Sequence, residues 1–178
     1  RLVVGVDTVL ESETFSAASQ NTGKTLFNTT TMTGTFASGQ FLSNASGITT
    51  IATGVVLRSY ATFPLFAQAS TICEIGLSFD TAAAPTNTVV DFGLLVAGAT
   101  NPFAPTDGAY FRLTDTGLRG VCNFNTTESQ TSALDFTIVP NQKHTFEINA
   151  TSERVEFWID GVLKGSITNV GNPAPFSA

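Results

Sequence analysis

Apolar and polar residues alternate with a period of two through much of the second half of the chain. This period is typical of a β-strand that buries one of its faces. In the strand predicted over residues 154–160, Val155, Phe157 and Ile159 fall on one side, and polar residues together with Trp158 fall on the other. We expect the first set to face the core, because successive side chains of a strand point to opposite faces.

Runs of this kind recur from residue 48 onward and predict a series of strands separated by Gly, Asn, Asp or Pro. These strands span Ile48–Tyr60, Thr71–Phe79, Thr88–Ala97, Gly108–Thr114, Leu118–Asn125, Lys143–Ala150, Arg154–Asp160 and Val162–Thr168. Residues 1–47 are rich in Thr, Ser, Asn and Gly, and predict only short strands near Leu2–Val6, Leu26–Phe27 and Phe36–Leu42. We interpret this segment either as an arm or as a set of edge strands.

The junctions between the runs carry recognisable turn chemistry. Asp160–Gly161 is a strong hairpin pair, Asp115–Gly117 supplies a Gly that can take positive φ, and residues 151–153 form a short polar connection. Residues 82–87 and 98–107 are predicted loops, and the second contains two prolines that cannot continue a central strand. The sequence shows no sustained apolar stripe with the 3.6-residue period of a helix, and no internal repeat.

The same alternation assigns one side of the other strands to the core. The residues expected to face inward there are Cys73, Ile75, Leu77, Phe79, Phe92, Leu94, Val96, Phe111, Leu113, Cys122, Phe124, Phe146 and Ile148. Because the two cysteines lack the CxxC spacing of a metal or redox site, we interpret them as core thiols. Their predicted orientation permits a disulfide across the sheets without requiring one.

Composition extends this picture to the whole chain. The 178 residues include 15 Phe and are 42% hydrophobic, but only 12% are charged. Residues that suit pleated, half-buried surfaces are abundant, and the Lys and Glu that usually cover helices are scarce. We therefore predict a single all-β domain over residues 1–178, built as a two-sheet antiparallel sandwich. The chain does not begin with Met, which we interpret as a processed protein or a piece of a longer one.

Charge and hydropathy restrict the partners. The net charge is −6 and the 8 Lys and Arg residues are scattered, so no basic patch is available to neutralise a nucleic-acid backbone. No apolar run approaches the roughly 18 residues that a membrane helix requires. We expect neither nucleic acid nor membrane as a partner.

Candidate chemistry is sparse. The one histidine, His144, shares a predicted strand face with Phe146 and Ile148, which favours a structural role. The sequence has no HxH or HExxH pair, no GxSxG elbow and no glycine-rich phosphate loop, so we expect no metal site, no cofactor and no catalytic triad.

Carboxylates that share a predicted strand face are the remaining candidates for catalysis. Glu74 lies near Asp80, and Glu156 shares a face with Asp160. Four residues of strand place the second pair roughly 13 Å apart, whereas a retaining glycosidase needs about 5 Å. We interpret Glu156 and Asp160 as residues of a solvated outer face. We therefore predict that the protein is not an enzyme. A glycosidase is the third hypothesis for its function.

A small set of aromatic and polar residues on the predicted outer faces is left for binding. Tyr110, Arg112, Asn123, Arg154 and Trp158 form this candidate interface. An exposed Trp with a nearby Tyr and Arg is typical of a protein interface or a sugar-stacking platform. The alternative that a neighbouring loop covers Trp158 is equally compatible with the sequence.

Two segments between residues 107 and 167 resemble known domains. Arg154–Ile167, an alternating strand that ends in Asp-Gly and continues as a second strand, resembles the strand-turn-strand of laminin G-like and concanavalin A-like domains. Gly108–Val121, followed by Asn123–Gln130, resembles domains of tailed-bacteriophage virion proteins. The resemblance implies a concanavalin A-like jelly roll.

The function that this resemblance implies is structural. Capsid decoration proteins, head fibres and tail appendages use such sandwiches, so we expect a non-enzymatic protein of the virion. Its partners would be other virion proteins and further copies of itself, for example in a trimer. The alternative is a carbohydrate-binding, lectin-like module or adhesin domain, secreted or on a cell surface, with a glycan as its ligand. Lectin relatives bind calcium through clustered Asp and Asn on loops, and this sequence shows no such cluster.

Overall fold

The computed structural model describes residues 25–30, 32–38, 40–44, 54–59, 70–82, 84, 86–124, 126–151 and 153–168. Every regular element among them is a β-strand, so the predicted all-β class is confirmed. The chain divides into two compact units, Arg1–Pro64 and Leu65–Ala178. Each unit is described by itself, and the single domain over the whole chain stays a prediction.

The first unit contains two antiparallel strand pairs. β1 (Thr25–Thr30) pairs with β4 (Gly54–Ser59), and β2 (Thr33–Ala37) pairs with β3 (Gln40–Asn44). The strand predicted near residues 36–42 is thus a hairpin, whose turn includes Ser38 at a φ of 52°. The expected strand at residues 2–6 lies outside the described residues.

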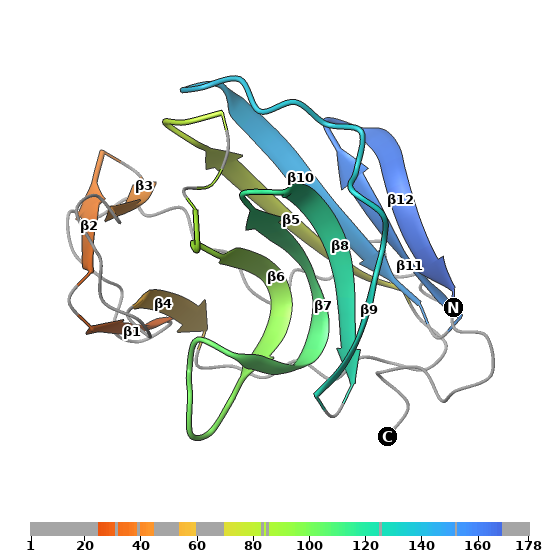
Figure 1. Ribbon diagram of the computed structural model, residues 1–178, viewed down its shortest axis with the longest axis horizontal. Coiled ribbons are helices and arrows are strands. Elements are labelled where there is room, and N and C mark those ends of the chain that lie inside the picture. Colours follow the sequence, from red (N-terminus) through yellow and green to blue (C-terminus); the bar gives the residue numbers. More distant parts are fainter. Residues whose placement is uncertain are drawn as a thin grey trace, which may run out of the picture. The chain divides into compact units, whose positions relative to one another are not determined.

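The second unit contains two four-stranded antiparallel sheets, which we name after a central strand of each (Figure 1). The β10 sheet has the order β12-β11-β10-β5, and the β7 sheet has the order β6-β7-β8-β9. Their strands are β5 (Thr71–Ser78), β6 (Val90–Ala97), β7 (Pro105–Thr114), β8 (Gly117–Phe124), β9 (Thr127–Gln130), β10 (Lys143–Ala150), β11 (Arg154–Ile159) and β12 (Val162–Thr168). The predicted antiparallel two-sheet packing is therefore present in this unit.

Phenylalanine rings form the centre of the core between the two sheets. Phe111 of β7 meets Phe146 of β10 and Phe157 of β11 edge to face, with ring centroids 5.3 and 5.2 Å apart. Phe157 also lies against Gly120 of β8, where an added Cβ would come within 2.4 Å of the ring. Edge-to-face aromatic contacts and the close approach at this glycine bring the sheets together.

The hairpins bear out the predicted turn chemistry. Asp160 and Gly161 have φ values of 51° and 76° and form the two-residue loop between β11 and β12. Positive φ at both positions matches the right-handed twist of the strands, which explains the Asp-Gly pair. Gly117 opens β8 at a φ of 118°, after the loop Asp115–Thr116.

The largest differences from the predicted strands of the second unit are at β7 and β9. β7 begins at Pro105, inside the predicted loop 98–107. A proline is acceptable at the first residue of a strand, because no ladder hydrogen bond is then lost from its middle. β9 was not predicted, because all four of its residues are exposed and its TESQ sequence has no apolar alternation. By contrast, β10 and β12 occupy the predicted ranges.

The core assignment is confirmed at most positions and wrong at two. Val96 is 55% exposed and Phe124 is 38% exposed. The register between β6 and β7 shifts after Val96, and Gly93 earlier in the strand has a φ of 142°, so strict alternation does not hold along β6. Phe124 is the last residue of β8, and its side chain lies at the end of the sheet rather than over its middle.

Both cysteines are free thiols that pack in or against the core. Burial raises the pKa of Cys73 to about 11 and that of Cys122 to about 12. Cys73 lies on β5, which approaches β6, whereas Cys122 lies on β8, two strands farther along the β7 sheet. This offset is about 10 Å sideways, more than the roughly 7 Å that a disulfide can bridge between Cα atoms. The permitted cross-sheet disulfide therefore does not fit the structure.

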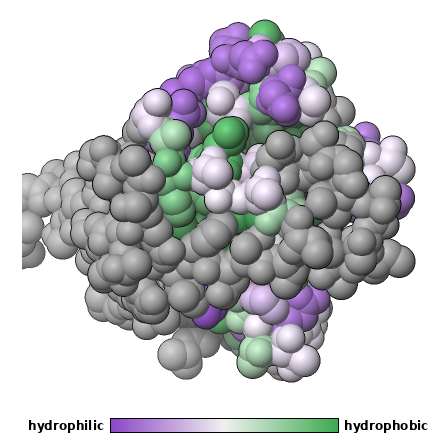
Figure 2. All heavy atoms as spheres, turned by 90° about the vertical axis from the view of Figure 1, so that its left-hand side faces the viewer, coloured by the Kyte–Doolittle hydropathy of each residue, from purple (hydrophilic) through white to green (hydrophobic). Residues whose placement is uncertain are grey.

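Hydrophilic residues gather at the top of the face that Figure 2 shows. In the part of the chain that the structure describes, no helix is long and apolar enough to cross a membrane.

Candidate functional site

The five predicted interface residues divide between the outer faces of the two sheets. Tyr110, Arg112 and Asn123 lie on β7 and β8, whereas Arg154 and Trp158 lie on β11 of the other sheet. The outer faces of a two-sheet sandwich point away from each other. The structure therefore does not bring the five residues together into one patch, and each face is a separate candidate site.

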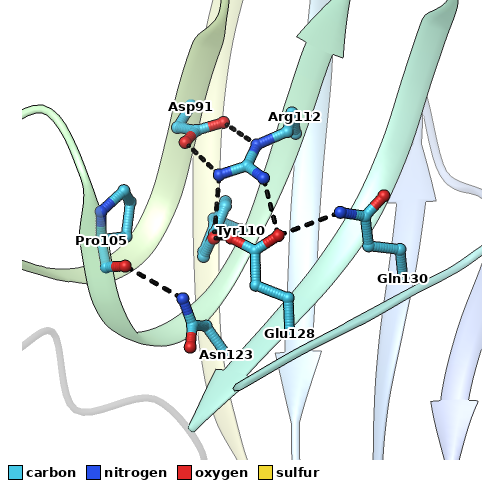
Figure 3. A network of polar contacts seen from close by, with 7 residues as sticks. All are labelled: Asp91, Pro105, Tyr110, Arg112, Asn123, Glu128 and Gln130. Atoms are coloured by element: carbon cyan, nitrogen blue, oxygen red, sulfur yellow. Dashed lines mark hydrogen bonds and ion pairs between the residues drawn. The ribbon is translucent and has the colours of Figure 1, made fainter. Parts of the chain in front are cut away.

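Arg112 is the centre of a network of ion pairs on the outer face of the β7 sheet (Figure 3). Its Nε and Nη2 donate to the two carboxylate oxygens of Asp91, both at 2.9 Å, and its Nη1 donates to Oε2 of Glu128 at 2.8 Å. Asp91 lies directly opposite Arg112 in the pairing of β6 with β7. Two-pronged pairing of this kind fixes the guanidinium in the plane of the carboxylate.

Tyr110 belongs to the same network and is fully buried. Its hydroxyl donates to Oε1 of Glu128 at 2.8 Å and accepts from Nη2 of Arg112 at 3.2 Å. The predicted exposed Tyr110 is therefore wrong: the side chains of Arg112, from the same strand, and of Glu128, from β9, close over its polar end (Figure 3). The ring is not available for stacking on a sugar.

Asn123 is also buried, with 2% of its surface exposed, which corrects its predicted place on an exposed patch. Its Nδ2 donates to the carbonyl oxygen of Pro105 at 3.0 Å, while its Oδ1 has no hydrogen-bond partner among the described residues. The amide thus ties the end of β8 to the first residue of β7. This contact is structural and turns the side chain away from solvent.

The electrostatics of the β7 face favour fixed charges. Burial of Glu128 opposes its ionisation, but hydrogen bonds from Tyr110, Arg112 and Gln130 outweigh burial and lower its pKa. The hydrogen bonds to Asp91 help to raise the pKa of Arg112, and burial together with the bond to Glu128 raises that of Tyr110. A general acid needs a raised carboxyl pKa near neutrality, so Glu128 is unsuited to that role.

The outer face of the β10 sheet is organised around Trp158. This side chain is half-buried, and its Nε1 donates to Oε2 of Glu156 at 3.3 Å. Arg154 pairs with the other oxygen of Glu156 at 2.7 Å. Glu156 is only 9% exposed, so the predicted solvated position is wrong: its neighbours on the strand cover it.

Asp160 does not share the outer face with Glu156, because the strand ends before it and the turn directs it to His144. Its Oδ2 lies 2.6 Å from Nδ1 of His144, and its Oδ1 accepts from the backbone N–H of Thr145 at 2.9 Å. The hydrogen bond with His144 is the main reason that the pKa of Asp160 is lowered.

His144 is 5% exposed and meets the ring of Phe136 edge to face at 4.9 Å. Its Nε2 is buried and has no hydrogen-bond partner in the described part of the chain. The contacts on its other nitrogen hold the β11–β12 turn against the start of β10. These contacts fit the structural role predicted for His144.

Asp91 and Glu128 are the functional-site residues that the sequence did not indicate. Asp91 could have been found from the strand register, since it stands opposite Arg112. Glu128 lies on β9, which lacks the alternation that marks a strand. Within the described ranges, no group of three or more His, Cys, Asp or Glu side chains is arranged to hold a metal ion.

Comparison of the chain with protein-family models, with curated proteins and with solved structures finds no match. The geometry of the two faces is therefore the basis for the functional proposal.

Proposed function

We propose that this chain is a non-enzymatic structural protein that acts through protein–protein contacts, of the kind that decorates a bacteriophage capsid or projects from the particle as an appendage. The concanavalin A-like jelly roll and the homo-oligomer belong to the same proposal. Support comes from the antiparallel two-sheet packing of the second unit and from the Asp-Gly hairpin that carries the resemblance.

The observation that carries the proposal is the contrast between engaged polar groups and exposed apolar groups. Arg112, Glu128 and Glu156 all bond to neighbouring side chains within their own faces. On the outer face of the β10 sheet, however, Ile72 is 56% exposed and Leu163 is 46% exposed. Leu163 lies directly opposite the half-buried Trp158, and exposed apolar side chains on the face that carries a Trp are typical of a protein contact surface.

Carbohydrate binding is the less favoured alternative, because one of its two expected stacking rings is absent from the surface. Tyr110 is fully buried, and Trp158 lies on the other sheet. A glycan would therefore meet a single half-buried ring, whereas a protein partner also covers the apolar residues around it.

A particle-binding assay tests the proposal. The purified chain is mixed with particles purified from the same source and lacking it, and the amount that pellets with the particles is measured. We expect saturable binding that Leu163→Asp reduces at least tenfold. Val139→Asp is the matched control, because Val139 is 47% exposed but lies outside the strands. Binding to a glycan array without any binding to particles would overturn the proposal in favour of a lectin.

A further inference from the structure

A row of four side chains crosses the outer face of the β10 sheet. Glu147 of β10 lies directly opposite Glu74 of β5 on one side and directly opposite Trp158 of β11 on the other. Trp158 lies in turn opposite Leu163 of β12. Directly paired residues of antiparallel strands have Cβ atoms about 5 Å apart. We call the first three of these residues, Glu74, Glu147 and Trp158, the acidic Trp row, and Leu163 lies at its end.

The two carboxylates of this row are uncompensated. Neither Glu74 nor Glu147 makes a hydrogen bond or an ion pair with another residue in the described part of the chain. Like charges directly opposite each other destabilise a sheet. Two other glutamates of the second unit differ in this respect, since Glu128 pairs with Arg112 and Glu156 pairs with Arg154.

Among the residues that the structure describes, no cation forms an ion pair with Glu74 or Glu147. Arg154 is engaged by Glu156. Lys143 runs along Gly76, with its Cε 2.6 Å from the position of an added Cβ there, and forms no ion pair with a described carboxylate. The row therefore presents two negative charges beside an indole ring.

An indole next to free carboxylates has the chemistry that binds an organic cation. The face of a Trp ring attracts a guanidinium or ammonium group more strongly than any other side-chain ring, and a carboxylate at the rim adds a charged hydrogen bond. An arginine matches both features, because its planar group stacks on the ring and donates several N–H bonds at its edge.

We infer that the acidic Trp row receives an arginine or lysine side chain of a basic partner protein. The inference rests on the proposed function and deepens it by naming the chemistry of the partner. The net charge of −6 makes a basic protein more suitable as this partner than a second copy of the chain. The exposed Ile72 and Leu163 lie on the same face, where they give the partner an apolar contact next to the charged one.

Trp158 is the only tryptophan of the chain, so its fluorescence reports on the row directly. A hexa-arginine peptide with blocked ends, titrated at low salt, is expected to change the emission with a saturable curve. Hexa-glutamate of the same length should leave it unchanged. A labelled peptide measured by anisotropy gives the affinity of variants that lack the Trp.

The variants are designed to separate the row from net charge. Glu74→Gln and Glu147→Gln should each weaken hexa-arginine binding about threefold, and Trp158→Leu should weaken it about fivefold or more. Glu153→Gln removes the same charge from the exposed β10–β11 turn and should stay within about twofold of the unchanged protein. If Glu74→Gln and Glu147→Gln bind as tightly as Glu153→Gln, the inference is wrong and the peptide is held by general charge.

The pelleting assay distinguishes this inference from the proposed function. Suppose that the chain pellets with particles and that Leu163→Asp reduces this binding, but that the row variants change neither pelleting nor peptide binding. Only the basic partner is then excluded. If the chain does not pellet with particles at all, the proposed function fails. Peptide binding that depends on the row would in that case still support a site for an arginine or lysine side chain on this face.

Discussion

The two outer faces of the sandwich use charge in opposite ways. On the β7 sheet, Arg112 binds two carboxylates and a buried tyrosine hydroxyl, so each of these groups has a partner within the protein. On the β10 sheet, Glu74 and Glu147 stand opposite each other without a counterion among the described residues. The first face is complete by itself. The second carries unpaired carboxylates and exposed apolar groups, and for this reason we propose it as the contact face.

The largest expected difference between the faces concerns their arginines. Arg112→Met leaves Asp91 and Glu128 without their cation in a site where the side chains are 12% and 27% exposed. Removing one member of a buried ion pair is strongly destabilising, and we expect the free energy of unfolding to fall by about 3 kcal/mol. Denaturant unfolding followed by circular dichroism measures this loss.

Arg154→Met is the matched control on the other face, because the Arg154 side chain is 57% exposed. The side chain of its partner Glu156 is only 12% exposed but keeps the hydrogen bond from Trp158, so we expect a loss of about 1 kcal/mol, smaller than that of Arg112→Met. Equal losses for the two variants would show that the faces do not differ in this respect.

Substitution of an aromatic residue should also lower the free energy of unfolding more on the β7 face than on the β10 face. Tyr110→Phe removes one hydroxyl, so that Oε1 of Glu128 loses a donor and Nη2 of Arg112 loses an acceptor, which we expect to cost about 1.5 kcal/mol. Trp158→Phe removes a longer, 3.3 Å bond to Glu156 from a half-buried ring. We expect a smaller loss from it, and a comparison of the two midpoints in urea tests this order.

The sequence predicted the strands better than the surfaces. Alternation located Phe111, Phe146 and Phe157 correctly in the core, and Asp-Gly located the β11–β12 turn. These features depend on local chemistry, namely the period of the strand and the positive φ of a two-residue loop. They need no knowledge of what lies beside the strand.

The candidate site was harder to predict, because burial of a polar side chain depends on partners that are distant in the sequence. Alternation placed Tyr110 on an outer face, but its burial results from Arg112 and from Glu128 on a strand with no apolar signal. Likewise, the pairing of Glu74 with Glu147 depends on β5 lying beside β10, a contact between segments 73 residues apart (147 minus 74). Neither partnership can be derived without the register of the sheet.

The β7 face should also give the protein part of its resistance to acid. The pKa of Glu128 is lowered in the folded state, so its contribution to stability is present above the pKa of an unfolded glutamate and is lost as the pH falls through the folded value. Glu128→Gln removes this dependence. Between about pH 6 and about pH 3, we expect the stability of this variant to fall less than that of the unchanged protein. Thermal unfolding at a series of pH values over this range measures the difference. A parallel decline of both curves would contradict the assignment of this carboxylate.

The smallest expected effect has the opposite sign and belongs to the β10 face. Glu147→Gln removes one of two like charges that lie directly opposite each other, so the isolated protein should become more stable by about 0.5 kcal/mol. Added salt screens the same repulsion, and the gain should shrink as ionic strength rises toward about 1 M. A loss of stability on Glu147→Gln would mean that the carboxylate is compensated within the chain. A gain in stability combined with weaker binding of hexa-arginine identifies a surface whose charge is kept for a partner, because the folded protein alone is better without it.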